Sequence, residues 1–461
     1  MQVVLINPYE LGRQPFGLAE PAAWLARDGH QVVCVDLALE RLERSVLERA
    51  DLVGLHLAMH TATRIAVEAM PRIRAAAPHA RVFAYGLYAP VNAAMLRDIG
   101  IDVVLGGEAE PDIAELARRL AAGDRDWQPA AAVNLSRIPF VVPDRTGLPA
   151  LTRYARLLMP DGSERVVGFL EATRGCKHLC RHCPVVPVYQ GRFRTVPVEV
   201  VVADARAQVA AGAEHLSFGD PDFLNGPTHA LRVLRAIGRE LPGLTFDATV
   251  KVEHLLRHRE HLAELAAHGC LFLTTAVESV DDAVLERLDK GHTRADFVTA
   301  VALAREAGIA LAPTFVAFTP WTTLGGYLAL LEHLVHLALV EAVPPVQLAI
   351  RLLVPAGSRL LELDDFAAMV EPFDPALLGH PWSHPDPRVD ALAREVQAIA
   401  ERAETEGLGR REAFTAVWQA AHRAAGRDAP ALPPALGAPI PHHSEPWYCC
   451  AEPTSQQLAS F

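Results

Sequence analysis

The sequence has no excess of basic residues. It contains 43 lysine and arginine residues against 55 aspartate and glutamate residues, a formal net charge of −12. Because nucleic-acid binding relies on basic surface that neutralises phosphates, this balance argues against a general nucleic-acid binder. No run of about 18 uncharged apolar residues occurs, which argues against a membrane-spanning helix. Residues 1–8 lack a basic flank and a cleavage-like site, and they predict a first strand instead of a signal peptide.

Cysteine is also scarce, with seven residues in a chain of 461. Three of the seven lie in one short motif, so the pattern does not indicate a disulfide framework, and a reducing, cytoplasmic location is expected. Hydrophobic residues make up 51% of the chain, which is enough for a full core, and the length predicts two or three domains.

The three clustered cysteines lie in Cys176-Lys-His-Leu-Cys180-Arg-His-Cys183, directly after an apolar run at 166–170 that is typical of a strand. Three thiolates on one loop can hold three corners of a four-iron cluster and leave the fourth iron open. A zinc site is the alternative, with His178 or His182 as a nitrogen ligand, although no second cysteine pair lies nearby. The spacing, the preceding strand and the sequence that follows favour the cluster.

The longer segment from Glu171 to Cys183 resembles the signature of the radical SAM (S-adenosylmethionine) superfamily. The resemblance implies that Cys176, Cys180 and Cys183 hold a [4Fe-4S] cluster whose open iron binds S-adenosylmethionine. One electron, from a reductant protein of flavodoxin or ferredoxin type, then yields a 5′-deoxyadenosyl radical. The resemblance further implies that His182, the residue before the third cysteine, lies near the adenine.

Residues 1–125 alternate short apolar runs with helical patterns. Strands are expected at 2–6, 31–37, 51–57, 80–85 and 103–105, and helices at 18–27, 63–77 and 111–122. This alternation predicts an open parallel α/β sheet, which binds ligands at the carboxyl ends of its strands.

Five stretches of this region, among them Phe16-Gly17-Leu18-Ala19 and Gly106-Gly107-Glu108-Ala109-Glu110, resemble the cobalamin-binding domain that precedes many radical SAM enzymes. The resemblance implies cobalamin, lined by the loop 7–15 and the segment 86–90. Asp28-Gly29-His30 departs from the cobalt-ligating Asp-x-His-x-x-Gly pattern because Val33 replaces the glycine, so His30 is interpreted as a turn residue. Two interpretations stay open: a domain that binds cobalamin, and one that has lost it and only packs on its neighbour.

A proline-containing connector is expected at 126–165, with a short hairpin at its end, and a catalytic domain at 166–365. Six apolar runs, at 166–172, 214–218, 245–250, 271–277, 309–317 and 346–353, are separated by helical patterns. Such repeats with right-handed crossovers predict a partial (βα)6 barrel, whose chemistry lies at the carboxyl ends of the strands. The cysteine loop follows the first of these strands.

Polar residues that follow the other strands are candidate ligands of S-adenosylmethionine, by their placement and by resemblance to the superfamily. Gly219 and Asp220 follow the second strand, and the resemblance implies that they hold the methionine amino group. The other candidates are Lys251 and Glu253 after the third strand, and Glu278 and Ser279 after the fourth. Capping and turn roles are the alternative for each of these residues.

A helical region is predicted at 366–430, and the proline-rich segment 431–461 contains Tyr448, Cys449 and Cys450. The run Cys449-Cys450-Ala451-Glu452-Pro453 resembles the tail of the CUAEP/CCAEP-tail radical SAM (seleno)proteins, in which the position of Cys450 can be selenocysteine. The resemblance implies that these cysteines take part in catalysis, with Tyr448 beside them. Because adjacent thiolates are a soft donor pair, an arsenic-type substrate is one hypothesis. A disordered tail with incidental thiols is the alternative.

These motifs predict a radical SAM enzyme that transfers a methyl or alkyl group, or forms another bond, on a small molecule. No nucleic-acid or membrane partner is expected. A tRNA-modifying radical SAM enzyme is a second hypothesis, weakened by the acidic charge and by the presence of only Cys34 in the N-terminal region. A non-catalytic metal or metalloid sensor that uses Cys449 and Cys450 is the third.

Overall fold

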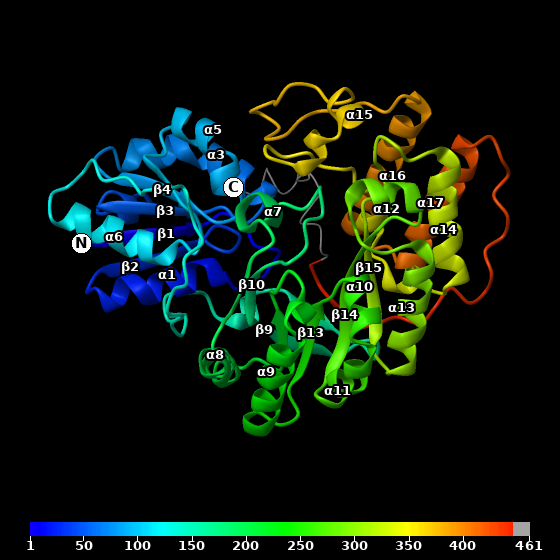
Figure 1. Cartoon of the computed structure of the whole chain (residues 1–461), viewed down its shortest axis with the longest axis horizontal. Coiled ribbons are helices and arrows are strands. Elements are labelled where there is room, and N and C mark those ends of the chain that lie inside the picture. Colours follow the sequence, from blue (N-terminus) through cyan, green and yellow to red (C-terminus); the bar gives the residue numbers. More distant parts are fainter. Residues whose placement is uncertain (446–461) are drawn as a thin grey trace.

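The computed structural model describes residues 1–445, which form an N-terminal α/β domain, a curled sheet surrounded by helices, and a C-terminal helical region (Figure 1). The predicted tail residues Tyr448, Cys449 and Cys450 lie outside the described residues. Among residues 1–445, no helix combines the length and the apolar character needed to cross a membrane.

Five parallel strands form the N-terminal sheet in the order β2-β1-β3-β4-β5. They are β1 (Gln2–Asn7), β2 (Gln31–Asp36), β3 (Leu52–His56), β4 (Arg81–Tyr85) and β5 (Val103–Val104). Successive side chains of a strand point to opposite faces, so Val3 and Leu5 pack in one core while Val4 and Ile6 pack in the other. A strand that is apolar on both faces must be covered on both, as parallel sheets are.

Helices cover both faces of this sheet. α1 (Phe16–Arg27) and α6 (Glu110–Ala121) share a core with Leu5, and α3 (His60–Ala76) shares a core with Ile6. The short helices of the domain are α2 (Arg44–Leu47), α4 (Tyr88–Val91) and α5 (Ala93–Asp98). The order of strands and helices predicted for residues 1–125 is confirmed.

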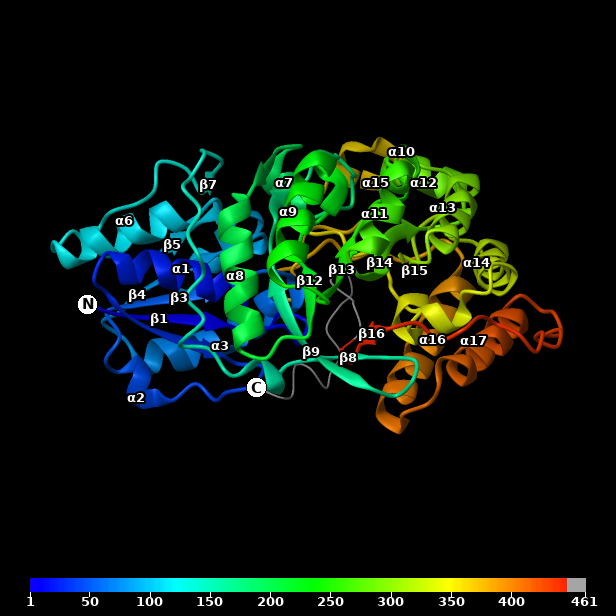
Figure 2. The same ribbon diagram turned by 90° about the horizontal axis from the view of Figure 1, so that it is seen from below.

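The barrel sheet has seven strands in the order β15-β14-β13-β12-β9-β8-β16. Five are mutually parallel: β9 (Glu164–Leu170), β12 (His215–Phe218), β13 (Thr245–Thr249), β14 (Cys270–Glu278) and β15 (Ala310–Phe315). The surrounding helices are α8 (Val198–Ala210), α9 (Pro227–Glu240), α10 (Val252–Arg257), α11 (Leu262–Ala267), α12 (Asp282–Leu288), α13 (Arg294–Glu306) and α14 (Leu324–His336) (Figures 1 and 2). This arrangement is the predicted curled, partial barrel.

The prediction of a sixth strand at 346–353 is wrong. Its first residues belong to a 3-10 turn over Pro345–Leu348, and the remainder contributes a single bridge between Arg351 and Phe318. Pro345 is the first residue of this turn, a position that the fixed φ of proline suits. β15 therefore forms one edge of the described sheet.

The chain returns to the opposite edge of the sheet after two long helices, α16 (Pro387–Glu406) and α17 (Arg410–Ala424). There β16 (His442–His443) pairs antiparallel with β8 (Arg156–Leu158), which itself forms the predicted hairpin with β9 (Figure 2). His443 Nε2 lies 2.8 Å from Asp247 Oδ1 of β13. We name residues 440–445 the C-terminal strap, since they close this edge.

Removing the His443 side chain is expected to loosen the strap. Burial would raise the pKa of Asp247, but His443 and His215 outweigh burial and hold this pKa well below its usual range. Because His443→Ala removes a hydrogen-bonding partner of the buried Asp247 carboxyl, it should lower the free energy of unfolding by ~1–3 kcal/mol. Urea denaturation measures this change, and limited proteolysis near residue 440 should become faster.

His442→Ala is the matched control, because the one hydrogen bond described for the His442 ring is to the nearby carbonyl of Ile440, at 3.0 Å. It should leave stability and proteolysis close to those of the wild type. Equal behaviour of the His443 and His442 variants would contradict the role given to the His443–Asp247 contact.

Candidate functional site

The carboxyl ends of the two parallel sheets line one cavity of about 370 Å³. Residues after β1, β3 and β4, such as Glu10, Met59 and Gly86, form its N-terminal wall, and residues at the ends of β9, β12, β13 and β14 form its barrel wall. Open α/β sheets and barrels both place ligands at this end of their strands. The cavity is therefore the candidate site of both domains.

All three motif cysteines line this cavity. β10 (Thr173–Gly175) leads into Cys176, and Gly175 has a φ of +72°, where an added Cβ would lie 2.4 Å from the carbonyl oxygen of Arg192. The turn therefore requires glycine. Cys176 and Cys180 are buried and Cys183 is partly exposed. Three sulfurs on one loop that open to a cavity fit the three-cornered ligation of a [4Fe-4S] cluster.

The two histidines of the motif have other neighbours. His182 Nε2 lies 3.2 Å from Glu278 Oε1, and His178 Nε2 lies 3.2 Å from His254 Nε2. The zinc alternative requires one of these rings beside the cysteine sulfurs. Since both rings contact other side chains within the described chain, the donor set at the loop is three sulfurs, which favours a cluster over zinc.

Glu278 lies at the carboxyl end of β14 with a φ of +67°, a strained value for a residue other than glycine. Its Oε1 is 3.2 Å from both Lys290 Nζ and His182 Nε2. Burial would raise the pKa of Glu278, but Lys290 and His182 outweigh burial and lower it to about 2. An ionised carboxylate on strained backbone at a cavity wall is typical of a ligand-binding residue.

Gly219 and Asp220 line the cavity, and both also have structural partners. An added Cβ on Gly219 would lie 2.2 Å from the Phe169 ring, so glycine is needed for packing against β9. Asp220 accepts hydrogen bonds from the amide of Ala172 and the hydroxyl of Thr173, and burial raises its pKa to about 7. Asp220 thereby holds the strand that leads to the cysteine loop.

The structure brings five of the seven predicted cofactor ligands to the cavity: His182, Gly219, Asp220, Lys251 and Glu278. Glu253 and Ser279 are not among the lining residues. Glu253 lies in the first turn of α10 and pairs with Arg257 at 2.8 Å, and Ser279 Oγ accepts a hydrogen bond from the amide of Asp281. Turn and pairing roles therefore describe these two residues better than contact with a cofactor.

Sequence reasoning missed Arg174, which lies on β10 at the cavity wall. Its guanidinium contacts four carboxylates, those of Glu20, Glu108, Glu110 and Glu171. The side chains of Arg174, Glu20, Glu108 and Glu110 are at most 10% exposed. One buried cation thus joins the N-terminal domain to the strand before the cysteines. The sequence signal that could have indicated these contacts was the pair of glutamates in the Gly106–Glu110 stretch.

Glu10 and His56 form a second pair that the sequence did not reveal. Glu10 Oε2 lies 3.7 Å from His56 Nδ1, and neither atom has a hydrogen-bond partner among the described residues. Burial, with Asp36 nearby, raises the pKa of Glu10 to about 8, and burial lowers the pKa of His56 to about 4. Both side chains are therefore uncharged at neutral pH. His30, interpreted as a turn residue, is not among the residues that line the cavity.

The raised pKa of Glu10 predicts a pH-dependent stability. A carboxyl with a pKa of 4.5 in the unfolded chain and about 8 in the folded one keeps a proton on folding. Its contribution to the free energy of unfolding therefore falls as the pH rises from about 4.5 to about 8, by at most ~1.4 kcal/mol per pH unit. Glu10→Gln should remove this slope, as chemical denaturation across that range measures.

The control for this change is Glu48→Gln. Glu48 is exposed, lies directly after α2 and pairs with Arg44 at the start of that helix. It should leave the pH dependence of the wild type unaltered. If Glu10→Gln also left the slope as it is, the assignment of a neutral, buried Glu10 would be contradicted.

Comparisons with known proteins agree with this geometry. Residues 170–320 match the radical SAM superfamily. The tRNA-2-methylthio-N(6)-dimethylallyladenosine synthase of Sphingopyxis alaskensis is 25% identical over 246 residues, which cover 50% of this chain and 51% of that protein. The hopanoid C-3 methylase of Methylococcus capsulatus is 26% identical over 321 residues, which cover 67% and 62%. The chain spans about half the length of the first of these relatives and less than two thirds of the second.

Solved structures share the fold over most of the chain. The radical S-adenosylmethionine methyltransferase TsrM from Kitasatospora setae, with tryptophan and a SAM analogue bound, gives a TM-score of 0.66 at 18% identity, covering 86% of this chain and 88% of that one. The cobalamin-dependent enzyme OxsB, with aqua-cobalamin and S-adenosylmethionine bound, gives 0.65 at 13% identity, covering 87% and 67%. The predicted fold class is confirmed.

Proposed function

We propose that this chain, with its radical SAM domain, is an enzyme that uses a [4Fe-4S] cluster and S-adenosylmethionine to transfer a methyl or alkyl group, or to form another bond, on a small molecule. The observation that carries the proposal is that the three cysteines, Glu278 and the strand ends of the N-terminal domain all line the same cavity. A reduced cluster with bound S-adenosylmethionine supplies radical chemistry.

The chain's own residues would bind and orient the reactants. Cys176, Cys180 and Cys183 would hold three irons of the cluster. The Glu278 carboxylate, kept ionised by Lys290 and His182, would accept hydrogen bonds from amino or hydroxyl groups of S-adenosylmethionine. Lys251, which is buried at the cavity wall, would pair with a carboxylate.

We propose cobalamin as a second cofactor, on the opposite side of the same cavity. The loop 7–15 contributes Glu10, Leu11 and Arg13 to the lining, and the segment 86–90 contributes Gly86, Leu87 and Tyr88. These two segments are the ones that the sequence predicts for cobalamin. Structures of TsrM with cobalamin and a [4Fe-4S] cluster, and of OxsB with aqua-cobalamin, support the same assignment for this chain.

Anaerobic reconstitution with iron and sulfide, with and without cobalamin, tests the proposal. We expect a [4Fe-4S] cluster in each chain. After reduction in the presence of S-adenosylmethionine, we expect formation of 5′-deoxyadenosine or S-adenosylhomocysteine. Cobalamin retained in stoichiometric amount would support methyl transfer as the reaction. A protein that holds zinc at Cys176–Cys183 and forms neither product would refute the proposal, and tight metalloid binding by such a protein would favour the sensor hypothesis.

The roles of Cys449, Cys450 and Tyr448 are a further part of the proposal, supported by the place of the strap. Glu445 accepts a hydrogen bond from Tyr9 and lines a smaller cavity of about 70 Å³ that shares Arg13 with the main one. We propose that Cys449, Cys450 and Tyr448 act on the substrate in the main cavity.

A double variant, Cys449→Ser with Cys450→Ser, tests the tail. If the substrate is an arsenic-type compound, this variant should bind arsenite more weakly than the wild type and should lose product formation. Arsenite binding and turnover equal to those of the wild type would refute this part of the proposal.

A tRNA substrate is the second candidate, favoured by the names of relatives such as the tRNA-2-methylthio-N(6)-dimethylallyladenosine synthases. The net charge of −12 opposes it, because phosphate contacts need basic surface. A strong, salt-sensitive mobility shift of tRNA in the presence of the protein would decide for this candidate.

A further inference from the structure

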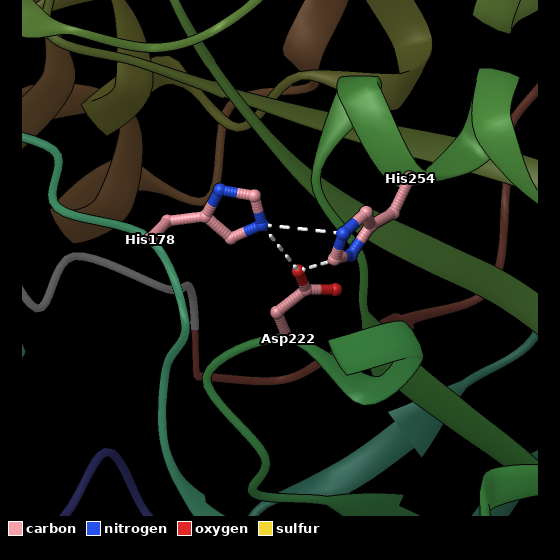
Figure 3. A group of neighbouring side chains, drawn as sticks. All are labelled: His178, Asp222 and His254. Atoms are coloured by element: carbon pink, nitrogen blue, oxygen red, sulfur yellow. Dashed lines mark hydrogen bonds and ion pairs between the residues drawn. The ribbon is translucent and has the colours of Figure 1, made fainter. Parts of the chain in front are cut away.

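Three potential metal ligands that the proposed function does not use meet beside the cysteine loop (Figure 3). His178 comes from the loop itself, Asp222 from the residue that precedes the 3-10 turn Phe223–Asn225, and His254 from α10. One donor atom of each lies within 4.8 Å of the other two. Three elements far apart in the sequence thus direct their side chains to a common point.

The donor atoms of the three side chains lie close together, and one change in the orientation of the His254 ring would let all three bind one metal ion. His178 Nε2 is 3.2 Å from His254 Nε2 and 3.7 Å from Asp222 Oδ2, and His254 Nδ1 is 2.6 Å from the same Asp222 oxygen. With metal–ligand bonds of about 2.0–2.2 Å, neighbouring ligand atoms lie roughly 2.9–3.6 Å apart. His254 presents Nε2 to His178 and Nδ1 to Asp222, so binding of one ion by all three side chains requires a rotation of the His254 ring that turns a single nitrogen toward both partners.

Hydrogen bonding sets the group apart from an ordinary histidine–aspartate contact. The Asp222 side chain is fully buried and that of His254 is 4% exposed. His254 Nδ1 and Asp222 Oδ2 form a close ion-pair contact of 2.6 Å, but its geometry is not that of a hydrogen bond, so neither atom has a hydrogen-bond partner among the described residues. A buried contact without hydrogen-bond geometry satisfies the two atoms poorly, and an ion bound by both would satisfy them.

The surroundings are those of metal-bound histidines. His178 Nδ1 lies 3.5 Å from Glu253 Oε2, an arrangement that orients the ring and leaves Nε2 for a metal. Asp222 Oδ1 accepts a hydrogen bond from the amide of Leu224, so Oδ2 remains for an ion. Glu253 also pairs with Lys251 at 3.5 Å, which offsets its charge. Glu253 thus contacts His178 with one carboxylate oxygen and Arg257 with the other.

We propose that His178, Asp222 and His254 bind one divalent transition-metal ion, zinc or iron(II), at a site separate from the cysteine cluster. Two imidazoles and a carboxylate suit these ions, whereas calcium and magnesium prefer oxygen ligands alone. Because His178 also lines the main cavity, the remaining coordination position opens toward it. The ligand there is an oxygen donor, either water or a carboxylate or hydroxyl group of the substrate.

Metal analysis of the anaerobically purified holoenzyme tests the site. With zinc in the growth medium, we expect one zinc per chain in addition to the cluster iron, measured by mass spectrometry. His254→Ala and Asp222→Asn should each lose this equivalent and keep the cluster iron. His268→Ala is the control, at a partly exposed histidine directly after α11, and should retain the zinc. A wild-type protein that holds cluster iron and no further ion overturns the site, as does undiminished zinc in His254→Ala.

A cluster-free protein separates this site from the proposed function. In the triple variant Cys176→Ala, Cys180→Ala, Cys183→Ala, with its fold checked by circular dichroism, we expect one Co²⁺ to bind per chain, with visible absorption typical of nitrogen and oxygen ligands. Adding His254→Ala should abolish this binding. Failure of the folded triple variant to bind Co²⁺ overturns the metal site and leaves the proposed function intact. Co²⁺ binding, in contrast, upholds the site even if the holoenzyme cleaves no S-adenosylmethionine.

Discussion

Replacing Cys176 by alanine is expected to abolish S-adenosylmethionine cleavage, with a loss of at least ~10³-fold, as removal of a group that acts within a catalytic unit does. Two thiolates cannot hold three corners of a [4Fe-4S] cluster, so the variant should also lose its cluster iron. Iron analysis and chromatography of 5′-deoxyadenosine after anaerobic reduction measure the two effects.

Cys270→Ala is the matched control. Cys270 is also buried, but it begins β14, contacts the carbonyl of Phe272 at 3.6 Å and is not among the cavity-lining residues. Burial raises the pKa of its thiol well above the usual range, as expected of an unreactive core cysteine. This variant should keep cluster and cleavage. Normal cleavage by Cys176→Ala would instead show that the cluster is held differently from the assignment made here.

Replacing Arg174 by methionine is expected to lower the free energy of unfolding by ~3–5 kcal/mol, the cost of breaking a buried ion pair from one side. The change leaves Glu20, Glu108 and Glu110 without the cation that they contact. Burial raises the pKa of Glu108 to about 7 and that of Glu110 to about 8. Ionised carboxylates are destabilised more than neutral ones by removal of the cation. The loss of unfolding free energy should therefore grow as the pH rises through this range. Urea denaturation at several pH values measures it.

Arg206→Met removes an exposed arginine that pairs with Glu240 and serves as the control. Exposed pairs contribute ~0–1 kcal/mol, so little change is expected. A loss in Arg174→Met no larger than in Arg206→Met would show that the carboxylates around Arg174 carry no charge that needs compensation, or that the two domains are joined by other contacts.

The strands that carry the site were predictable because each is a short apolar run bounded by turn residues. The sixth run, 346–353, has the same apolar character, but its first residues continue a 3-10 turn that begins at Pro345, a position that the fixed φ of proline suits. β16 could not be predicted, because two residues in a proline-rich segment show no periodicity. Its position depends on the contact of His443 with Asp247, whose partners lie almost 200 residues apart.

The same distinction between local and long-range signals applies to the site. The three cysteines are close in sequence, and Glu278 follows directly from the end of its strand, so both could be found from the sequence. The four carboxylates around Arg174 come from two domains, and their meeting depends on how the domains dock. Glu253 was predicted from a correct strand end, yet its side chain turns to His178, which no spacing rule indicates.

The pairing of β16 with β8 also has a consequence for the biosynthesis of the protein. The β8–β9 hairpin leaves the ribosome long before β16 is translated, so its outer edge stays unpaired until the helices α16 and α17 have been made and the strap has returned. Unpaired strand edges recruit other chains. Nascent molecules are therefore exposed to association during this interval, and completion of the barrel is a late event in the maturation of the protein.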